Sequence, residues 1–458
     1  MSKEPTYEEL MSPINYLNTR VAANIAGIPL TVPEAVVAGE LAGLNVLLVS
    51  DTGWGKSQLV SAIYNGHFGG NENGIWMKAR PDTETEDIFF RMNMEAVKRE
   101  LNTASVQKLI YVVDEINRSP PPIQDKFLGM GDGTMETPDG RQIFLGRDGY
   151  SIMLATANMG NGEFAGTWEL DRAVLNRLHI TLDLDYFSIE DRDEQKVNTM
   201  GSADPKIREV KLNDISDKIL AAWRHISKDV CNPGLEAEIA LMVLGPGLRQ
   251  CQLKGTKTRA WPGLCQDCKH AGNICELVKQ SAPRTRRAVL RYAYGLKYMA
   301  MLKAKHLKKA FDESDLDPYD MIFTAFKLSS AYHGNLNPGI LRADYYEENA
   351  GMMEAVYKKL TETFREMEDS FISPTLECWE EDGQIITDFV KTGKSVYPLS
   401  EKWFAKQAVK RGYAEGGKAL MEKIVGKSEA VKPYEQSEGY LNIRWLPDML
   451  RERKKDEE

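Results

Sequence analysis

The sequence predicts an α/β fold in which a parallel sheet is covered by helices and is followed by a mainly helical region. Three apolar runs carry this prediction, "VLLV" at 46–49, "LIYVVDE" at 109–115 and "YSIMLATAN" at 150–158. They are short, and the second and third are rich in β-branched and aromatic residues, as buried parallel strands are. Because stretches with helical spacing alternate with these runs, a helix-covered parallel sheet is favoured.

The first run leads into the glycine-containing turn "VSDTGWGKSQ" at residues 49–58, and helical residues follow. Strand, glycine turn and helix form the context of a phosphate-binding loop, whose backbone N–H groups point at the phosphates. Gly53 and Gly55 can adopt the backbone angles that such a loop needs. Lys56 would reach the β- and γ-phosphates, and the Ser57 hydroxyl would hold Mg²⁺.

Ser50 departs from the usual pattern, which places a glycine at this position. Ser50 is small, and the position needs a tight turn more than a missing side chain, so the departure weakens the motif without breaking it. The sequence therefore predicts a nucleotide site at this loop. Its predicted contact residues are Ser50, Asp51, Thr52, Gly53, Trp54, Gly55, Lys56, Ser57 and Gln58.

Polar residues end the second and third strands, at the edge where open α/β sheets bind ligands. Asp114 is placed to hold Mg²⁺ through water, and Glu115 is placed to polarise an attacking water. The alternative, a pair of solvated carboxylates, is disfavoured because the loop and the acidic strand end occur in the required order. Asn158 could orient the water, although an asparagine at a strand end is more often a cap or turn residue.

The chain is long enough for two to three domains. Between the second and third strands, "METPDGRQIFLG" at 135–146 contains a Pro-Asp-Gly turn and predicts a short hairpin. Helical spacing dominates after about residue 205, in stretches such as 214–226, 235–244 and 286–302. We therefore expect three domains. They are an α/β domain at 1–204, a helical lid at 205–335 and a mainly helical C-terminal extension at 336–458.

One apolar stripe lies in this extension and predicts a helix that faces a core rather than a functional surface. The residues of the stripe are Met353, Val356, Leu360, Phe364, Met367 and Phe371.

Several stretches resemble the MoxR group of AAA+ ATPases. They are "VVDEINRSPPPIQDKFLGMG", "METPDGRQIFLG" and "IMLATANMGNGEFAGTWELDRAVLNRL". The run "GT-x-x-L-x-x-A-x-x-x-R" is similar to the subgroup that includes NorQ, CbbQ and the gas-vesicle protein GvpN. The segment "RPDTETEDIF" at 80–89 also resembles these proteins. The resemblance covers about residues 20–335 and leaves the last 120 or so residues outside it.

The resemblance implies roles for individual residues. Asn158 would be the first sensor, and Arg177 would be the arginine finger that reaches the ATP of a neighbouring subunit, with Arg172 as its rival. Arg284 would be the second sensor, carried by the helical lid, although Arg286 and Arg287 lie close in sequence. The predicted hairpin would face the central channel or a partner.

The resemblance also implies an activity and an assembly. ATP and Mg²⁺ would be used in a homo-oligomeric ring, expected to be a hexamer, because a finger supplied in trans needs a neighbour. The ring would act as a chaperone that remodels a protein client, beside a partner with a von Willebrand factor A domain. A fold class does not fix the client, so the client rests on analogy.

Four cysteines crowd into one part of the predicted lid, with the spacing C-x13-C-x2-C-x6-C. They are Cys251, Cys265, Cys268 and Cys275. A C-x2-C pair lets two thiolates converge on one ion, and two more complete a tetrahedral set, with His270 as a possible substitute. Zn²⁺ and a [4Fe–4S] cluster both suit four cysteines. The alternative is four reduced thiols in a loop; Cys231 and Cys378 are expected to be buried thiols.

Composition limits the other functions. The formal charge is −9, from 58 basic and 67 acidic residues, which argues against a general nucleic-acid coat. A nucleic-acid motor or loader remains the main alternative, because the basic stretch "RTRRAVLR" and a metal-stapled lid would suit one. A nucleotide-gated scaffold with little turnover is a third interpretation. Neither a signal peptide nor an apolar run of membrane length is evident, so a cytoplasmic location is expected.

Overall fold

The computed structural model describes residues 3–83, 105–106, 108–136, 142–158, 167–199, 212–248 and 274–368, with short pieces between 372 and 453. The chain divides into two compact units, and each is described by itself. The first comprises Met1–Ala237, Arg284–Gly334 and Asn349–Gly351. The second comprises Glu238–Pro283, Asn335–Glu348 and Met352–Glu458. The predicted domain boundaries at 204/205 and 335/336 stay predictions.

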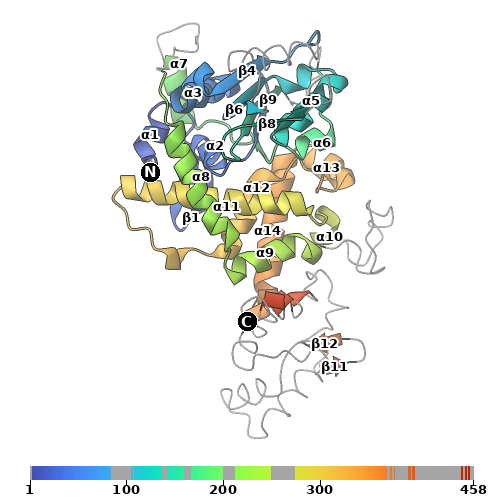
Figure 1. Cartoon of the computed structure of the whole chain (residues 1–458). Helices are drawn as coiled ribbons and strands as arrows, with labels where there is room; N and C mark the ends of the chain where they lie inside the picture. Colours follow the sequence, from blue (N-terminus) through green and yellow to red (C-terminus); the bar gives the residue numbers. More distant parts are fainter. Residues whose placement is uncertain are drawn as a thin grey trace. The chain divides into compact units, whose positions relative to one another are not determined.

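A five-stranded parallel sheet forms the centre of the first unit, in the order β10-β3-β9-β6-β4 (Figure 1). The strands are β3 (Val46–Ser50), β4 (Gly74–Lys78), β6 (Ile110–Asp114), β9 (Ile152–Asn158) and β10 (Ile180–Asp183). Every residue of the three middle strands is buried, as the apolar runs at 46–49, 109–115 and 150–158 predicted. The predicted parallel α/β fold is confirmed.

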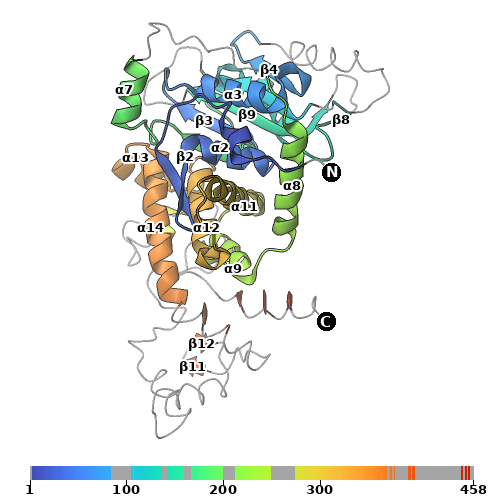
Figure 2. The ribbon, with the colours of Figure 1, turned by 90° about the vertical axis from the view of Figure 1, so that its left-hand side faces the viewer.

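Helices cover both faces of this sheet because side chains along each strand alternate between the faces. On one face, Leu47, Tyr111 and Met153 pack with residues of α5 (Pro121–Gly131) and α6 (Arg172–Leu175). On the other face lie α2 (Val32–Leu41) and α3 (Lys56–Phe68), which are seen beside β3 and β9 in Figure 2. The sheet is therefore the middle of three layers.

The remaining helices of the first unit include those predicted at 214–226 and 286–302, which are confirmed. Its other helical elements are α1 (Tyr7–Met11), α7 (Asp191–Thr199), α8 (Ser216–Cys231), α11 (Pro283–His306) and α12 (Pro318–Ser329). In the described part of the chain, no helix is both long and apolar enough to span a membrane.

The hairpin predicted at 135–146 is present as β7 (Thr134–Glu136) paired antiparallel with β8 (Gln142–Leu145). Its Pro-Asp-Gly turn lies outside the described residues. The short strand β5 (Ser105–Val106) adds to β8 in parallel. A second hairpin, β1 (Val21–Ile25) with β2 (Ile28–Thr31), was not predicted from the sequence.

A buried histidine pairs with a glutamate between α3 and α2 and also contacts the N-terminal segment. His67 Nδ1 lies 2.9 Å from Glu40 Oε1, and both side chains are fully buried. His67 Nε2 donates to the Leu10 carbonyl at 2.7 Å. Burial lowers the pKa of His67, but the Glu40 carboxylate outweighs this effect, so the net pKa is raised. The His67 ring therefore links α1, α2 and α3.

The other described elements are helical apart from one short hairpin. They are α9 (Leu235–Leu244), α10 (Ile274–Leu277), α13 (Pro338–Tyr345), α14 (Asn349–Met367), β11 (Val390–Thr392) and β12 (Ser395–Tyr397). The stretch predicted as a helix at 235–244 is thus confirmed. In α14, Met353, Val356, Leu360 and Phe364 are buried as the stripe predicted. The side chains of Met367 and Phe371 lie outside the described set.

Helix α11 crosses α2 at a glycine, where the two backbones approach closely. A Cβ added at Gly295 would lie 2.4 Å from the Ala38 carbonyl oxygen and 3.1 Å from the Ala42 Cβ. One turn earlier in α11, the buried Tyr292 hydroxyl donates to the Ala35 carbonyl at 3.1 Å. The crossing of α2 and α11 therefore depends on the absence of a side chain at residue 295.

We predict that Gly295→Ala lowers the free energy of unfolding by about 1–3 kcal/mol, because an added methyl group must push the two helices apart. The loss should exceed the gain in helix propensity that alanine brings. Chemical denaturation measures the difference. Gly234→Ala is the matched control, since its nearest contact is a flexible Glu236 side chain at 3.4 Å. Equal stability of the two variants would contradict the close crossing.

Candidate functional site

The loop between β3 and α3 has the backbone conformation expected of a phosphate-binding loop. Gly53 and Gly55 have φ angles of +91° and +76°, in the left-handed region that glycine adopts readily. Helix α3 begins directly after them, at Lys56. Its first backbone N–H groups have no partner within the helix and carry the positive end of the helix dipole. The loop can therefore bind an anion.

Lys56 is held inside this loop by all three of its donors. Its Nζ lies 2.9 Å from the Ser50 carbonyl oxygen, 2.8 Å from Ser50 Oγ and 2.7 Å from the Asp51 carbonyl oxygen. Burial lowers the pKa of Lys56, and nearby carboxylates, Asp185 foremost, oppose that effect. Ser50 Oγ in turn donates to the Asp51 carbonyl at 2.9 Å. The serine that departs from the loop pattern thus contributes a hydroxyl that binds the lysine.

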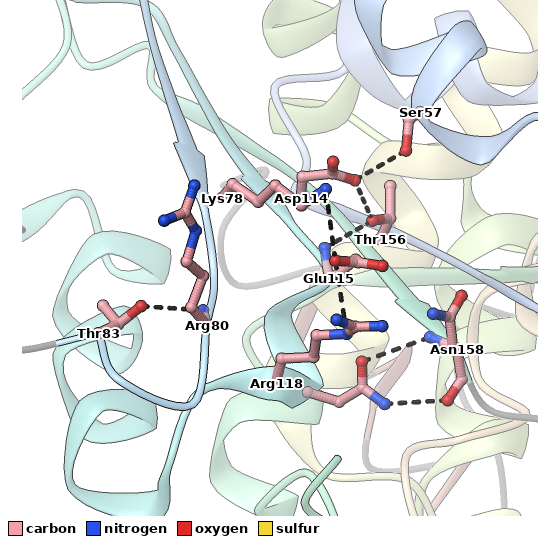
Figure 3. Close-up of polar contacts among 10 residues, drawn as sticks. Ser57, Lys78, Arg80, Thr83, Asp114, Glu115, Arg118, Thr156 and Asn158 are labelled. Atoms are coloured by element: carbon pink, nitrogen blue, oxygen red, sulfur yellow. Dashed lines mark hydrogen bonds and ion pairs between the residues drawn. The ribbon is translucent and has the colours of Figure 1, made fainter. Parts of the chain in front are cut away.

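A network of hydroxyl and carboxylate groups joins α3, β6 and β9 beside the loop (Figure 3). Asp114 Oδ1 accepts from Ser57 Oγ at 2.8 Å and from Thr156 Oγ1 at 2.7 Å. Thr156 Oγ1 also accepts from the Glu115 backbone N–H at 2.8 Å. The structure therefore brings Ser57, Asp114 and Glu115 together, as the sequence predicted, and adds Thr156 to them.

Glu115 adopts an unusual backbone conformation with a φ of +58°, which costs a non-glycine residue about 1–3 kcal/mol. Its carboxylate lies 3.7 Å from Lys78 Nζ, at the end of β4, and 3.4 Å from Arg118 Nε. Figure 3 shows the two cations on opposite sides of the Glu115 carboxylate, with Lys78 on the side of Asp114 and Arg118 on the other side. Neither cation was predicted as a site residue from the sequence.

Asn158 ends β9 directly beside Ser50, its partner in the register of β3 and β9. Its backbone is held from both sides by Asn117, whose Nδ2 donates to the Asn158 carbonyl at 2.9 Å and whose Oδ1 accepts from the Asn158 N–H at 3.3 Å. The Asn117 carbonyl accepts from the Trp168 N–H at 2.7 Å. Asn117, which belongs to the "DEINR" stretch, therefore fixes the end of β9.

Arg177 and Arg284 meet at one carboxylate. Arg177 Nε donates to Asp132 Oδ2 and Arg284 Nη2 donates to Asp132 Oδ1, each at 2.7 Å. Partial burial raises the pKa of Asp132, but the two guanidinium groups outweigh it, so the pKa is lowered. Arg172, the rival of Arg177, has an exposed side chain, and Arg287 is exposed as well.

The two arginines lie at the end of the sheet opposite the loop. The Arg177 carbonyl accepts from Asn45 Nδ2 at 2.8 Å, and Asn45 directly precedes β3. Lys56 follows the other end of that five-residue strand. At about 3.3 Å per residue, Asn45 and Ser50, the last residue of β3, are separated by about 17 Å. Arg177 and Arg284 are therefore not brought to the loop of their own chain.

Cys251, Cys265 and Cys268 lie outside the described residues, and Cys275 is half-buried in α10. Within the described ranges, no group of three histidine, cysteine or acidic side chains could hold a metal ion. The predicted metal site stays a prediction. Cys231 was expected to be buried, but it is exposed because it is the last residue of α8; Cys378 is outside the described residues.

Thr156 offers a test of the network. Thr156→Val keeps the side-chain shape but removes the acceptor of the Glu115 N–H and one of the two hydroxyl donors to Asp114 Oδ1. We therefore expect the free energy of unfolding to fall by about 1–3 kcal/mol. Thr181→Val is the matched control on β10, the edge strand of the same sheet, because the buried Thr181 Oγ1 has no hydrogen-bond partner among the described residues. Chemical denaturation measures the free energy of unfolding of both variants. Equal decreases for Thr156→Val and Thr181→Val would contradict the role of Thr156.

Comparisons with known proteins agree with the sheet and loop. Residues 45–165 match the sequence family described as the AAA domain of the dynein-related subfamily. A search of the curated proteins found no similar sequence. Parts of the stretches that resemble MoxR proteins, residues 84–89 and 159–166, lie outside the described residues.

Two solved structures are remote likenesses. A candidate ATPase from Cytophaga hutchinsonii has 17% identity and a TM-score of 0.46, and the match covers 71% of this chain and 88% of that chain. A full-length MCM homologue from Methanopyrus kandleri has 16% identity and a TM-score of 0.37, and the match covers 70% of this chain and 59% of that chain. The family match and the parallel sheet together show that this chain contains a nucleotide-binding domain of the AAA+ type.

Proposed function

We propose that this chain binds ATP with Mg²⁺ at the loop of residues 50–57 and hydrolyses it. The observation that carries the proposal is the 2.8 Å contact between Ser57 Oγ and Asp114 Oδ1 beside the buried ammonium group of Lys56. A hydroxyl and a carboxylate oxygen are the ligand types that Mg²⁺ prefers, so these two residues fit the ion. Bound Mg²⁺ would neutralise charge on the β- and γ-phosphates.

The loop residues bind and orient the triphosphate in this proposal. Phosphate oxygens would take the place of the neutral oxygens that now accept from Lys56, which strengthens the contact because both partners are then charged. The N–H groups at the start of α3 add donors to the same phosphates. Gly53 and Gly55 let the backbone approach closely, and the Ser50 hydroxyl keeps the lysine directed into the loop.

Glu115 is proposed to accept a proton from the attacking water, and Asn158 to orient that water. Thr156 and Asn117 are positioning residues, because they hold the Glu115 backbone N–H and the Asn158 backbone respectively. The ion pairs of Glu115 with Lys78 and Arg118 fix the direction of its carboxylate without occupying both of its oxygens.

The remaining catalytic charge would come from a neighbouring copy of the chain. Arg177 lies at the amino end of the sheet, which supports the proposal that it acts on the nucleotide of another protomer. Arginines supplied in this way stabilise the charge on the transferred phosphoryl group, by as much as about 10³–10⁵ in rate in other systems. A homo-oligomeric ring, a hexamer by resemblance, would give each loop one such neighbour.

The client is proposed from resemblance. MoxR-like ATPases act as chaperones on protein partners, often beside a protein with a von Willebrand factor A domain. The β7–β8 hairpin supports a similar role here, because it exposes Phe144, whose side chain is 60% accessible, as an apolar contact for a protein. We therefore propose that ATP hydrolysis remodels or activates a protein partner.

Substitution of Glu115 tests the proposed hydrolysis. Glu115→Gln should lower kcat by about 10²–10⁴-fold, the range for loss of a general base, while ATP still binds. Lys56→Ala should instead weaken ATP binding. Phosphate release assays and nucleotide titrations measure the two effects. Glu194→Gln, which changes an exposed glutamate on α7, is the matched control. No hydrolysis by the wild type, or full activity of Glu115→Gln, would rule the proposal out.

The four cysteines are proposed to bind zinc or a [4Fe–4S] cluster that stabilises the segment 251–275. Purified protein should carry about one zinc ion or one cluster per chain, and Cys265→Ser with Cys268→Ser should remove it. Elemental analysis measures the metal, and visible absorption distinguishes the cluster from zinc. The control is Cys231→Ser, which changes an exposed cysteine outside the cluster. Unchanged metal content in the double variant would contradict the site.

A further inference from the structure

The contact between Asp132, Arg177 and Arg284 joins residues from three separate parts of the first unit. Asp132 follows the last residue of α5, Arg177 follows α6 and Arg284 lies in the first turn of α11. Each carboxylate oxygen of Asp132 accepts from a different arginine at 2.7 Å. One carboxylate therefore orients both guanidinium groups.

This cluster is short of negative charge. Two guanidinium groups share one carboxylate, and the nearby His179 adds no charge. Burial of its imidazole and the nearby Arg284 lower the pKa of His179 to about 3, so the ring is neutral at ordinary pH. The buried Arg284 Nε has no hydrogen-bond partner among the described residues. The two arginines and Asp132 thus carry a net charge of +1, and at least one guanidinium N–H group is without a hydrogen-bond acceptor among the described residues.

The cluster is also open to an anion from outside. The side chains of Arg177 and Arg284 are 27% and 36% exposed. Planar guanidinium donors match phosphate oxygens in geometry as well as in charge. Phosphates bound at the chain's own loop would lie about 17 Å away, at the other end of β3, so an anion that binds here would come from another molecule.

We propose that Asp132 is an exchangeable counter-ion that holds Arg177 and Arg284 as a pair, and that the γ-phosphate of ATP bound to a second copy of this chain takes its place. The inference rests on the proposed ATPase function and extends it, since it assigns Arg284 to the neighbour's nucleotide and gives Asp132 a positioning role. With ATP in the neighbour, the phosphate accepts from both arginines. Without ATP, Asp132 keeps them oriented and neutralised.

Mixing two inactive variants tests the assignment of Arg284. Lys56→Ala protomers would lack nucleotide but supply the arginine pair, whereas Arg284→Ala protomers would bind nucleotide but supply no Arg284. A one-to-one mixture should recover about a quarter of the wild-type ATPase rate, because half of the protomers bind ATP and half of their neighbours carry Arg284. If Arg284 served its own nucleotide, the mixture would stay inactive and the inference would be overturned.

Controls separate a structural defect from the predicted one. Arg284→Ala alone should stay folded at the assay temperature and should bind ATP with wild-type affinity, since the residue is far from its own loop. Arg287→Ala, an exposed arginine on the same helix, should keep full ATPase activity. A wild type without ATPase activity would reject the proposed function and this inference together, whereas an active wild type with an inactive mixture would reject this inference alone.

Inhibition of the ATPase by inorganic phosphate tests whether a phosphate can replace Asp132 at the two arginines. Asp132→Asn keeps the shape but removes the competing charge, so inorganic phosphate should inhibit the ATPase at about tenfold lower concentration. Asp125→Asn, an exposed aspartate on α5, should leave phosphate inhibition unchanged. Equal phosphate inhibition of Asp132→Asn and wild type would overturn the exchange. Phosphate binding to the wild type without recovery in the mixture would show a site for free phosphate, which also overturns the inference.

Discussion

The shared oxygen of Asp114 is the interaction on which the rest of the site depends. Asp114 Oδ1 accepts from hydroxyl groups of α3 and β9 while its own residue ends β6, so three segments meet at one atom. Thr156, one of those donors, also accepts from the Glu115 backbone, which keeps Glu115 in its strained left-handed conformation. The positions of the proposed magnesium ligands and of the proposed base are thus set by the same hydrogen bonds.

The parallel sheet divides the functional groups between its two ends. The carboxyl ends of β3, β6 and β9 carry the loop, the acidic pair and Asn158, while the amino ends of β3 and β10 lie beside Arg177. Because strands of about five residues separate these ends, one protomer holds an incomplete set of groups near its own loop. In the proposed ring, a neighbouring copy would supply the arginines to each loop.

The strands and loop could be predicted because apolar runs, glycines and acidic strand ends are local signals. Strands β4 and β10 were missed because "GIWMK" and "ITLD" are interrupted by glycine, lysine, threonine or aspartate and so do not form continuous apolar runs. Thr156 was missed because it stands inside an apolar run, where a hydroxyl looks like a tolerated core residue. Asp132 follows a glycine and precedes another, so it resembles a turn residue until the structure brings Arg177 and Arg284 to it.

The central claim is that this loop and the neighbouring strand ends bind magnesium and a nucleoside triphosphate together. Isothermal titration of the folded chain with ATP tests it most directly, in the presence of Mg²⁺ and after chelation. The account predicts saturable uptake of one nucleotide per chain that weakens sharply without Mg²⁺ and when Ser57 is changed to alanine. Folded wild-type protein that takes up neither ATP nor ADP in the presence of Mg²⁺ would contradict the account.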